Sequence, residues 1–147
     1  MAVKLSTGLR QGVAITGSLK NLLDNGFIRI YSGTEPASAD ASIGSAVLMN
    51  EISAGGTGTP VTWEATAPGG VLSKSVAENW TGNIIEGGNP VFFRYVLSSD
   101  TGDASSTAVR IQGSAGVLGK DLFIAELPMV TGQPQSFSLF QIALPEA

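Results

Sequence analysis

The sequence predicts an all-β fold, a β-sandwich or jelly roll of about eight short strands with a short N-terminal arm and helix. Short runs rich in β-branched and aromatic residues recur along the chain, and Gly- and Pro-rich turns separate them. Helical spacing of apolar residues is found only near the start of the chain. We therefore expect an arm with a short helix over residues 1–26 and a single β-sandwich domain over residues 27–147.

The first half of the arm carries a weak helical signal. Leu5, Leu9 and Val13 are four residues apart, which permits a short amphipathic helix, but Gly8 and Gly12 disfavour it. A terminal segment is ordered only where other parts of the structure hold it. Two alternatives therefore remain open: the arm packs on the end of the sandwich, or it docks on another subunit.

Turns and strands alternate after the arm. Ser18 is a suitable N-cap for a short helix over residues 19–25, and Gly26 is a suitable stop. Residues 33–45 have the composition of a long surface loop, and the glycines at 69–70 suit a tight hairpin. The expected strands cover residues 27–32, 46–52, 61–66, 71–76, 91–97, 109–112, 122–127 and 135–144.

Two of these strands are informative. Residues 91–97 are the run richest in apolar and aromatic side chains, so we expect the central strand there. One face would hold Val91, Phe93, Tyr95 and Leu97, and the other Phe92, Arg94 and Val96. In the last strand, Phe137 and Leu139 have one phase, and Phe140, Ile142 and Leu144 have the opposite one. This strand either contains a bulge near residues 139–140 or is covered on both faces, by the core and by a neighbouring subunit.

Composition limits the functions that the chain can have. It contains no Cys and no His, which removes thiol nucleophiles, thiolate zinc sites and His-based triads. Scattered basic residues and a net charge of −4 argue against a nucleic-acid partner, and no apolar run is long enough for a membrane helix. Charged residues make up only 14% of the chain, which favours surfaces covered by neighbouring subunits over the alternative of a neutral monomer coated with Ser and Thr.

The acidic residues do not form a convincing reactive site. Asp100 and Asp103, with Asp40 in another loop, supply too few of the roughly six to eight oxygen ligands that calcium requires. Four glutamates are expected on solvated faces or turns: Glu51, Glu64, Glu78 and Glu86. We therefore expect no metal, no cofactor and no enzymatic activity.

The two tryptophans, Trp63 and Trp80, allow two interpretations. An indole face beside polar neighbours can stack on a sugar ring. Tryptophans of a β-sandwich more commonly lie in its core or at a subunit interface.

Several blocks of the sequence resemble a family of small virion structural proteins of tailed bacteriophages, and the similarity extends over nearly the whole chain. The blocks are Leu5-Ser-Thr-Gly-Leu-Arg10, Asn25-Gly-Phe-Ile-Arg-Ile-Tyr-Ser-Gly-Thr34 with Pro36, Gly69-Gly-Val-Leu-Ser-Lys74, Phe93-Arg-Tyr95, Asp100-Thr-Gly102 and Val109-Arg-Ile-Gln-Gly113. In size and β-content such proteins are similar to jelly-roll capsid decoration (cement) proteins, which sit as trimers on the head lattice.

The resemblance implies a capsid decoration protein that is made in the host cytoplasm, binds the head lattice on the capsid exterior and stabilises it. Its expected partners are the major capsid protein or other virion proteins and copies of itself, as a homotrimer. The alternatives are a tail, neck or collar component, or a virion module that binds a receptor or glycan. Expected interface residues are Leu5, Leu9, Arg10, Val13, Trp63 and Trp80, with the arm as the first docking element.

Overall fold

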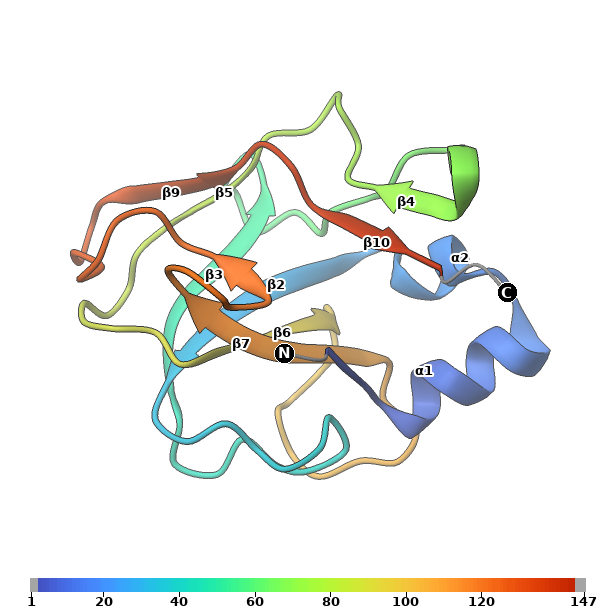
Figure 1. The fold of residues 1–147 in the computed structure, drawn as a ribbon, viewed down its shortest axis with the longest axis horizontal. Helices are drawn as coiled ribbons and strands as arrows, with labels where there is room; N and C mark the ends of the chain where they lie inside the picture. Colours follow the sequence, from blue (N-terminus) through green and yellow to red (C-terminus); the bar gives the residue numbers. More distant parts are fainter. Residues whose placement is uncertain (1–2, 145–147) are drawn as a thin grey trace.

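Ten strands form two sheets in the computed structural model, which describes residues 3–144 (Figure 1). The strands are β1 (Lys4–Leu5), β2 (Gly26–Ser32), β3 (Val47–Ala54), β4 (Val71–Ser73), β5 (Trp80–Asn83), β6 (Phe92–Leu97), β7 (Arg110–Gly116), β8 (Leu122–Phe123), β9 (Pro134–Phe137) and β10 (Gln141–Ala143). The helical elements are α1 (Thr7–Gln11), the π-helical turn η1 (Gly12–Thr16), α2 (Leu19–Leu23) and the 3₁₀ turn η2 (Pro68–Gly70).

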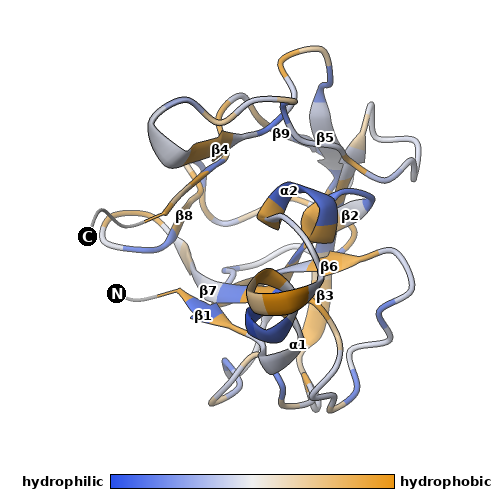
Figure 2. Cartoon of the chain, turned by 90° about the vertical axis from the view of Figure 1, so that its right-hand side faces the viewer, coloured by the Kyte–Doolittle hydropathy of each residue, from blue (hydrophilic) through white to orange (hydrophobic). Residues whose placement is uncertain are grey.

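The large sheet has the order β1-β7-β6-β2-β3-β5-β9, and β8 pairs with β7. Only the β7–β8 pair is parallel, while β4 and β10 form a separate antiparallel pair. In Figure 2 the strands surround an interior, with β2, β3 and β6 on one side and β4 and β8 on the other. The predicted all-β sandwich with a short helix is confirmed.

The central strand β6 lies between β2 and β7, and both of its faces are buried. Phe93 and Tyr95 belong to the hydrophobic core, whereas Phe92, Arg94 and Val96 are buried on the opposite face. The predicted division of this strand into two faces is therefore confirmed. Apolar side chains in both phases are what a strand covered on both sides requires.

Aromatic side chains fill the core and tie α2 to it. The rings of Trp63 and Trp80 meet edge to face at 5.2 Å between centroids. The indole Nε1 of Trp63 donates to the Tyr95 hydroxyl at 3.0 Å, and that hydroxyl donates to the carbonyl of Leu23 in α2. Because Leu23 is itself fully buried, the boundary expected at residue 26 does not mark a break in packing.

The first helix also packs on its own sandwich. Leu9 is fully buried in the core. Ser6 caps α1, since its Oγ accepts from the Leu9 amide at 3.1 Å, and it also accepts from the Arg110 amide at 2.9 Å. A Cβ on Gly8 would lie only 2.3 Å from the carbonyl oxygen of Thr107. The glycine expected to weaken a helix here is thus the residue that permits its close packing.

Several expected strands are corrected. Residues 61–66 and most of residues 122–127 lie outside strands. The first of these segments does approach residues 71–76, as the expected hairpin requires, but only through an isolated bridge between Trp63 and Lys74. Val61 and Trp63 are buried without a strand ladder. Alternation at these positions reflected burial rather than continuous pairing.

The last expected strand is divided in two. β9 pairs with β5 in the large sheet, and β10 pairs with β4 in the small one. Phe137 and Phe140 both pack against the core, although they have opposite phases, because the chain leaves the β conformation between the two strands. Leu139 points away and is 66% exposed. The change of phase marks a crossing between sheets rather than the expected bulge or a continuous strand covered on both faces.

Candidate interaction groove

Two polar loops, residues 33–46 and residues 98–109, cover the outer face of the large sheet, which is the face opposite the core. Arg110 is 1% exposed and forms a bidentate ion pair with Asp100, through Nε to Oδ2 at 2.6 Å and Nη2 to Oδ1 at 3.0 Å. It also donates to the carbonyls of Ala39 at 3.1 Å and Asp103 at 2.7 Å. One guanidinium thus joins β7 to both covering loops.

A second buried arginine, Arg94, holds the first of these loops, residues 33–46, without a carboxylate. Arg94 donates to Oε1 of Gln112 at 2.8 Å and to the carbonyls of Ala41 at 2.6 Å and Ser38 at 3.3 Å. Its Nη1 has no hydrogen-bond partner among the described residues. Burial lowers the pKa of Arg94, and the nearby charge of Arg110 lowers it further. The contacts of Arg94 fix the loop over residues 33–46 to the sheet.

The carboxylates considered for metal binding do not converge. Both oxygens of Asp100 accept from Arg110. Asp40 accepts from the amide and hydroxyl of Thr7 at 2.8 and 2.6 Å, and these bonds lower the pKa of its carboxyl. Among residues 3–144, no group of three His, Cys, Asp or Glu side chains is placed to hold a metal ion. These acids instead fasten loops and the arm.

Of the four glutamates expected on the surface, one is simply exposed and the other three are bonded to neighbouring segments. Glu86 is exposed. Glu51 pairs with Arg29 at 2.8 Å, and Glu64 accepts from the amide of Val76 at 2.6 Å. Three further bonds converge on Glu78, from the amide and hydroxyl of Thr62 and from Nε1 of Trp80. Three of the four acids therefore hold neighbouring segments together.

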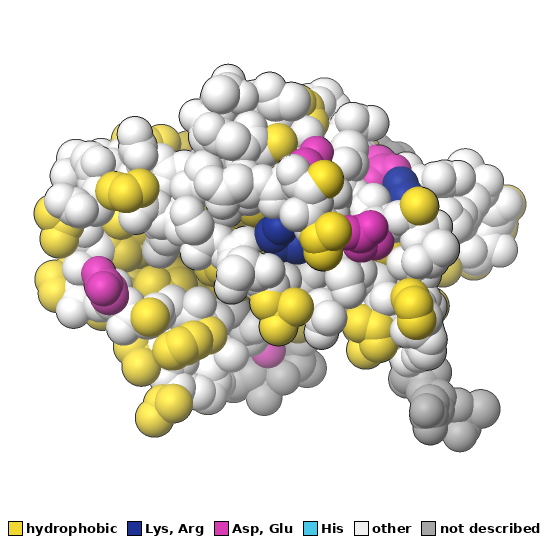
Figure 3. Space-filling view, turned by 90° about the horizontal axis from the view of Figure 1, so that it is seen from above, with side chains coloured by type: hydrophobic (Ala, Val, Ile, Leu, Met, Phe, Trp, Pro, Cys, Tyr) yellow, Lys and Arg dark blue, Asp and Glu magenta, His cyan; other side chains and the backbone are white. Residues whose placement is uncertain are grey.

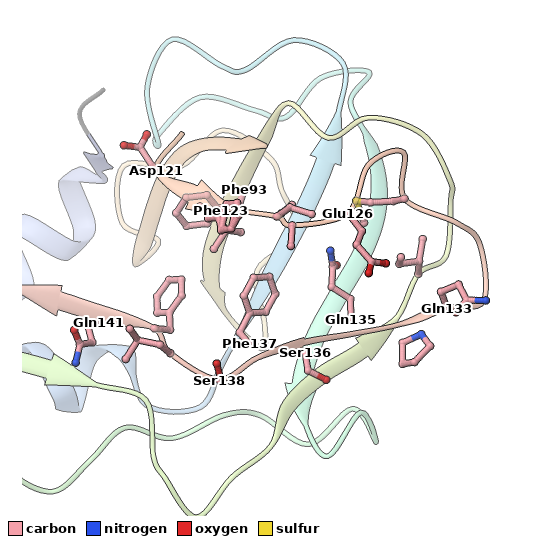
Figure 4. Close-up of a pocket in the computed structure, with 18 of the residues that line it drawn as sticks. Phe93, Asp121, Phe123, Glu126, Gln133, Gln135, Ser136, Phe137, Ser138 and Gln141 are labelled. Atoms are coloured by element: carbon pink, nitrogen blue, oxygen red, sulfur yellow. The ribbon is translucent and has the colours of Figure 1, made fainter. Parts of the chain in front are cut away.

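The main hollow of the molecule lies on the core side, between the segment around β8 and the segment around β9. It has a volume of about 880 Å³ and is open to solvent along one side. Ile84, Phe93 and Ile111, all nearly fully buried, contribute to its lining. Phe137 reaches into it toward Phe93 from the opposite wall, as Figure 4 shows. We call this hollow the groove.

The groove follows an unclosed seam of the fold. Among the described strands, β8 pairs only with β7 and β9 pairs only with β5. No ladder of backbone hydrogen bonds therefore joins β8 to β9 across the groove. Each strand therefore has an edge without a partner strand facing this region. Natural sheets usually protect such edges by covering or pairing them.

Exposed apolar side chains surround the opening. Val3 is 46% exposed, Phe123 58%, Val130 55% and Leu139 66%, and all four line the groove. Hydrophobic side chains gather toward the same end of the molecule in Figure 3, where Figure 1 places the turn before β9. We call these four residues the groove rim. Exposed apolar side chains grouped around a hollow are typical of an interaction site.

Few charged groups accompany this apolar lining. Asp121 and Glu126 are its acidic members, and it includes no Lys or Arg. Ser114 donates to Asp121 from its amide at 2.9 Å and its hydroxyl at 3.0 Å. Glu126 is exposed and forms no hydrogen bond or ion pair with any described residue. In Figure 4 it lies beside Gln135 within the groove.

The expected interface residues are divided between core and surface. Leu9, Trp63 and Trp80 are at most 3% exposed, so for these three the expectation of partner contact is wrong. All three side chains belong to the hydrophobic core of their own chain. Leu5 and Val13 are 45% and 43% exposed, and Arg10 is also exposed, so these three remain accessible.

Sequence reasoning did not select the groove rim, although two signals pointed to it. Leu139 is out of phase with the apolar side chains that follow it, and Phe123 is out of phase with Leu122 and Ile124. A strand with apolar side chains in both phases has a second surface to cover. Phe123 and Leu139 are the unmatched members of those two segments, whereas Val3 and Val130 carry no such signal.

Comparisons with protein-family models, with curated protein sequences and with solved structures found no match to this chain. Within residues 3–144, no helix has the length and apolar character needed to cross a membrane.

Proposed function

We propose that this protein is a structural component of a bacteriophage virion, a decoration (cement) protein that assembles as a homotrimer on the capsid exterior. Its partner on the particle is the major capsid protein, and its role is to stabilise the head lattice. The observation that carries the proposal is the groove, because an open apolar seam with an exposed rim is a surface for assembly. The resemblance of several sequence blocks to phage virion proteins suggests the setting.

The lining of the groove supports assembly rather than hydrolysis. Hydrolysis by paired carboxylates requires two acids with divided roles. Ser114 fastens Asp121 to β7 through Oδ2, Glu126 is exposed, and no contact among the described residues joins the two acids. The neighbouring amide of Gln135 accepts from Nδ2 of Asn50 at 2.9 Å, which fixes this side chain as part of the wall.

The glycan-binding alternative loses the residues on which it depended. Trp63 and Trp80 are 3% and 0% exposed, so neither indole face can stack on a sugar. The tail, neck and collar alternatives use the same kind of assembly surface, and location on the particle separates them from the head.

The decisive experiment locates the protein on purified virions of the phage that encodes it. Particles produced without the protein are imaged by electron cryomicroscopy, before and after the purified protein is added back. We expect added density at regular positions on the head lattice and greater resistance of the heads to heat. Density on the tail or neck, or no binding to either, would overturn the assignment to the head.

A further inference from the structure

We propose that the groove receives the α1–η1 segment of a second copy of this chain, so that copies associate head to tail. The inference deepens the proposed function and rests on it for the premise that the chain works by assembling. The segment, residues 7–16, carries three exposed side chains that suit the groove: Arg10, Val13 and Ile15.

Apolar complementarity is the first argument. Ile15 is 88% exposed and Val13 is 43% exposed, although both lie in an ordered helical segment. The groove rim offers matching side chains, among them Phe123 and Leu139. Burial of apolar side chains from both partners is the main favourable term in association.

Charge complementarity is the second argument, and this segment satisfies it. Arg10 is exposed and forms no ion pair with any described residue, and its Nη2 donates only to the Thr7 hydroxyl at 3.1 Å. Glu126 is the unpaired carboxylate of a groove without Lys or Arg. An arginine beside apolar side chains on one surface thus matches a carboxylate beside apolar side chains on the other.

The arrangement in space makes the contact intermolecular. Figure 1 shows α1 at the right of the molecule and β9 with the preceding turn at the left, so the segment of the same chain lies away from that end of the groove. Leu9 also holds α1 to its own core. Two different patches then meet at each contact, which gives a heterologous interface that either closes into a ring or continues as a chain.

The first test measures the mass of the purified protein by sedimentation velocity over a range of concentrations. We expect association of the wild type, and Kd higher by about tenfold or more for Ile15→Asp and for Leu139→Asp. Val76→Asp is the matched control, because Val76 is 87% exposed and lies outside both patches; we expect no change. Circular dichroism checks that each variant is folded. A wild type that stays monomeric overturns the proposal.

Mixing the two variants tests the head-to-tail geometry. Ile15→Asp keeps an intact groove and Leu139→Asp keeps an intact segment, so the mixture retains one working contact. We expect a 1:1 dimer with twice the mass of the 15.0 kDa chain and no growth beyond it. A mixture that remains monomeric overturns the pairing of these two patches. Association lost in Leu139→Asp but intact in Ile15→Asp shows that another segment fills the groove, and this also overturns it.

Charge reversal tests the pairing of Arg10 with Glu126. Arg10→Glu and Glu126→Arg should each weaken association severalfold, and the chain that carries both should regain most of it, because each contact again joins opposite charges. A double variant no better than either single variant overturns this pairing. All these measurements use the protein without capsids, so a negative result leaves the location on the virion to its own experiment.

Discussion

The two faces of β6 are both buried, but different interactions cover them. On the core side, Phe93 and Tyr95 pack among aliphatic and aromatic side chains from several elements. On the outer side, Arg94 and its neighbour Arg110 bind carbonyl oxygens of polar loops. The core side is apolar yet left open along the groove, whereas the outer side is polar and closely fastened.

The difference reflects the chemistry of the segments that cover each face. Residues 33–45 contain few large apolar side chains, so the loop gains little from burial and is held by directed hydrogen bonds. Segments around β8 and β9 have apolar side chains in both phases and can cover the core while presenting further apolar surface. The fastened face therefore stabilises the fold, and the open face is available for assembly.

The largest expected effect breaks the outer face. Asp100→Ala removes the carboxylate of a buried ion pair and leaves Arg110 without its counter-charge, which should lower the free energy of unfolding by about 3–5 kcal/mol. Urea unfolding of the purified variant measures the change. Asp103→Ala is the control, because that side chain accepts only from the exposed Thr101 hydroxyl, and its loss should stay within about 0.5 kcal/mol. Equal losses in the two variants would contradict the importance of the buried pair.

A smaller effect is expected from the polar contact of the core side. Tyr95→Phe removes the hydroxyl that links Trp63 to the carbonyl of Leu23, but the indole still reaches that carbonyl at 3.3 Å. We expect a loss of about 0.5–1.5 kcal/mol, because no buried group is left entirely without a partner. Urea unfolding checks the value, and a loss as large as that of Asp100→Ala would show that the core depends on this network as much as the outer face depends on its ion pair.

Replacement of the unpaired arginine separates global stability from the order of the loop. Arg94→Met removes a buried charge that has no carboxylate partner, so the loss of its hydrogen bonds is offset by the end of its desolvation. We expect the free energy of unfolding to change by less than about 1 kcal/mol. Hydrogen exchange should nevertheless speed up at the amides of Ala41 and Ile43, which are protected by loop contacts. Unchanged exchange there would show that Arg94 does not order the loop.

The sequence predicted the apolar side of this comparison better than the polar side. Alternation at residues 91–97 gave both faces of β6, because side-chain phase is a local property. The buried role of Arg94 and Arg110 depends on loops distant in sequence, and no local pattern records that. The strand expected at residues 109–112 ends before Gly113, yet Gly113 lies within β7, where a Cβ would approach the Phe93 ring at 2.8 Å.

The same distinction applies to the candidate site. Helical spacing put Val13 on the same face as the buried Leu9, yet Val13 is exposed. The groove forms only where segments around β8 and β9 meet across the core, which no local pattern records. The sequence indicated its rim through apolar side chains of unmatched phase, such as Leu139, without indicating which segments would face each other.

The smallest expected effect concerns the contact between the arm and the outer loop. Hydrogen bonds from Thr7 lower the pKa of Asp40 below its ordinary value near 3.8, so the ionised form is favoured in the folded state. The resulting stabilisation is fully present above the ordinary value and is lost as the pH falls through the lower, folded-state pKa. Asp40→Asn should therefore be slightly less stable than the wild type at pH 6, and the difference should shrink toward pH 2. Urea midpoints of both proteins across this range test the sign, and a difference that grows on acidification would show that ionised Asp40 does not hold the arm.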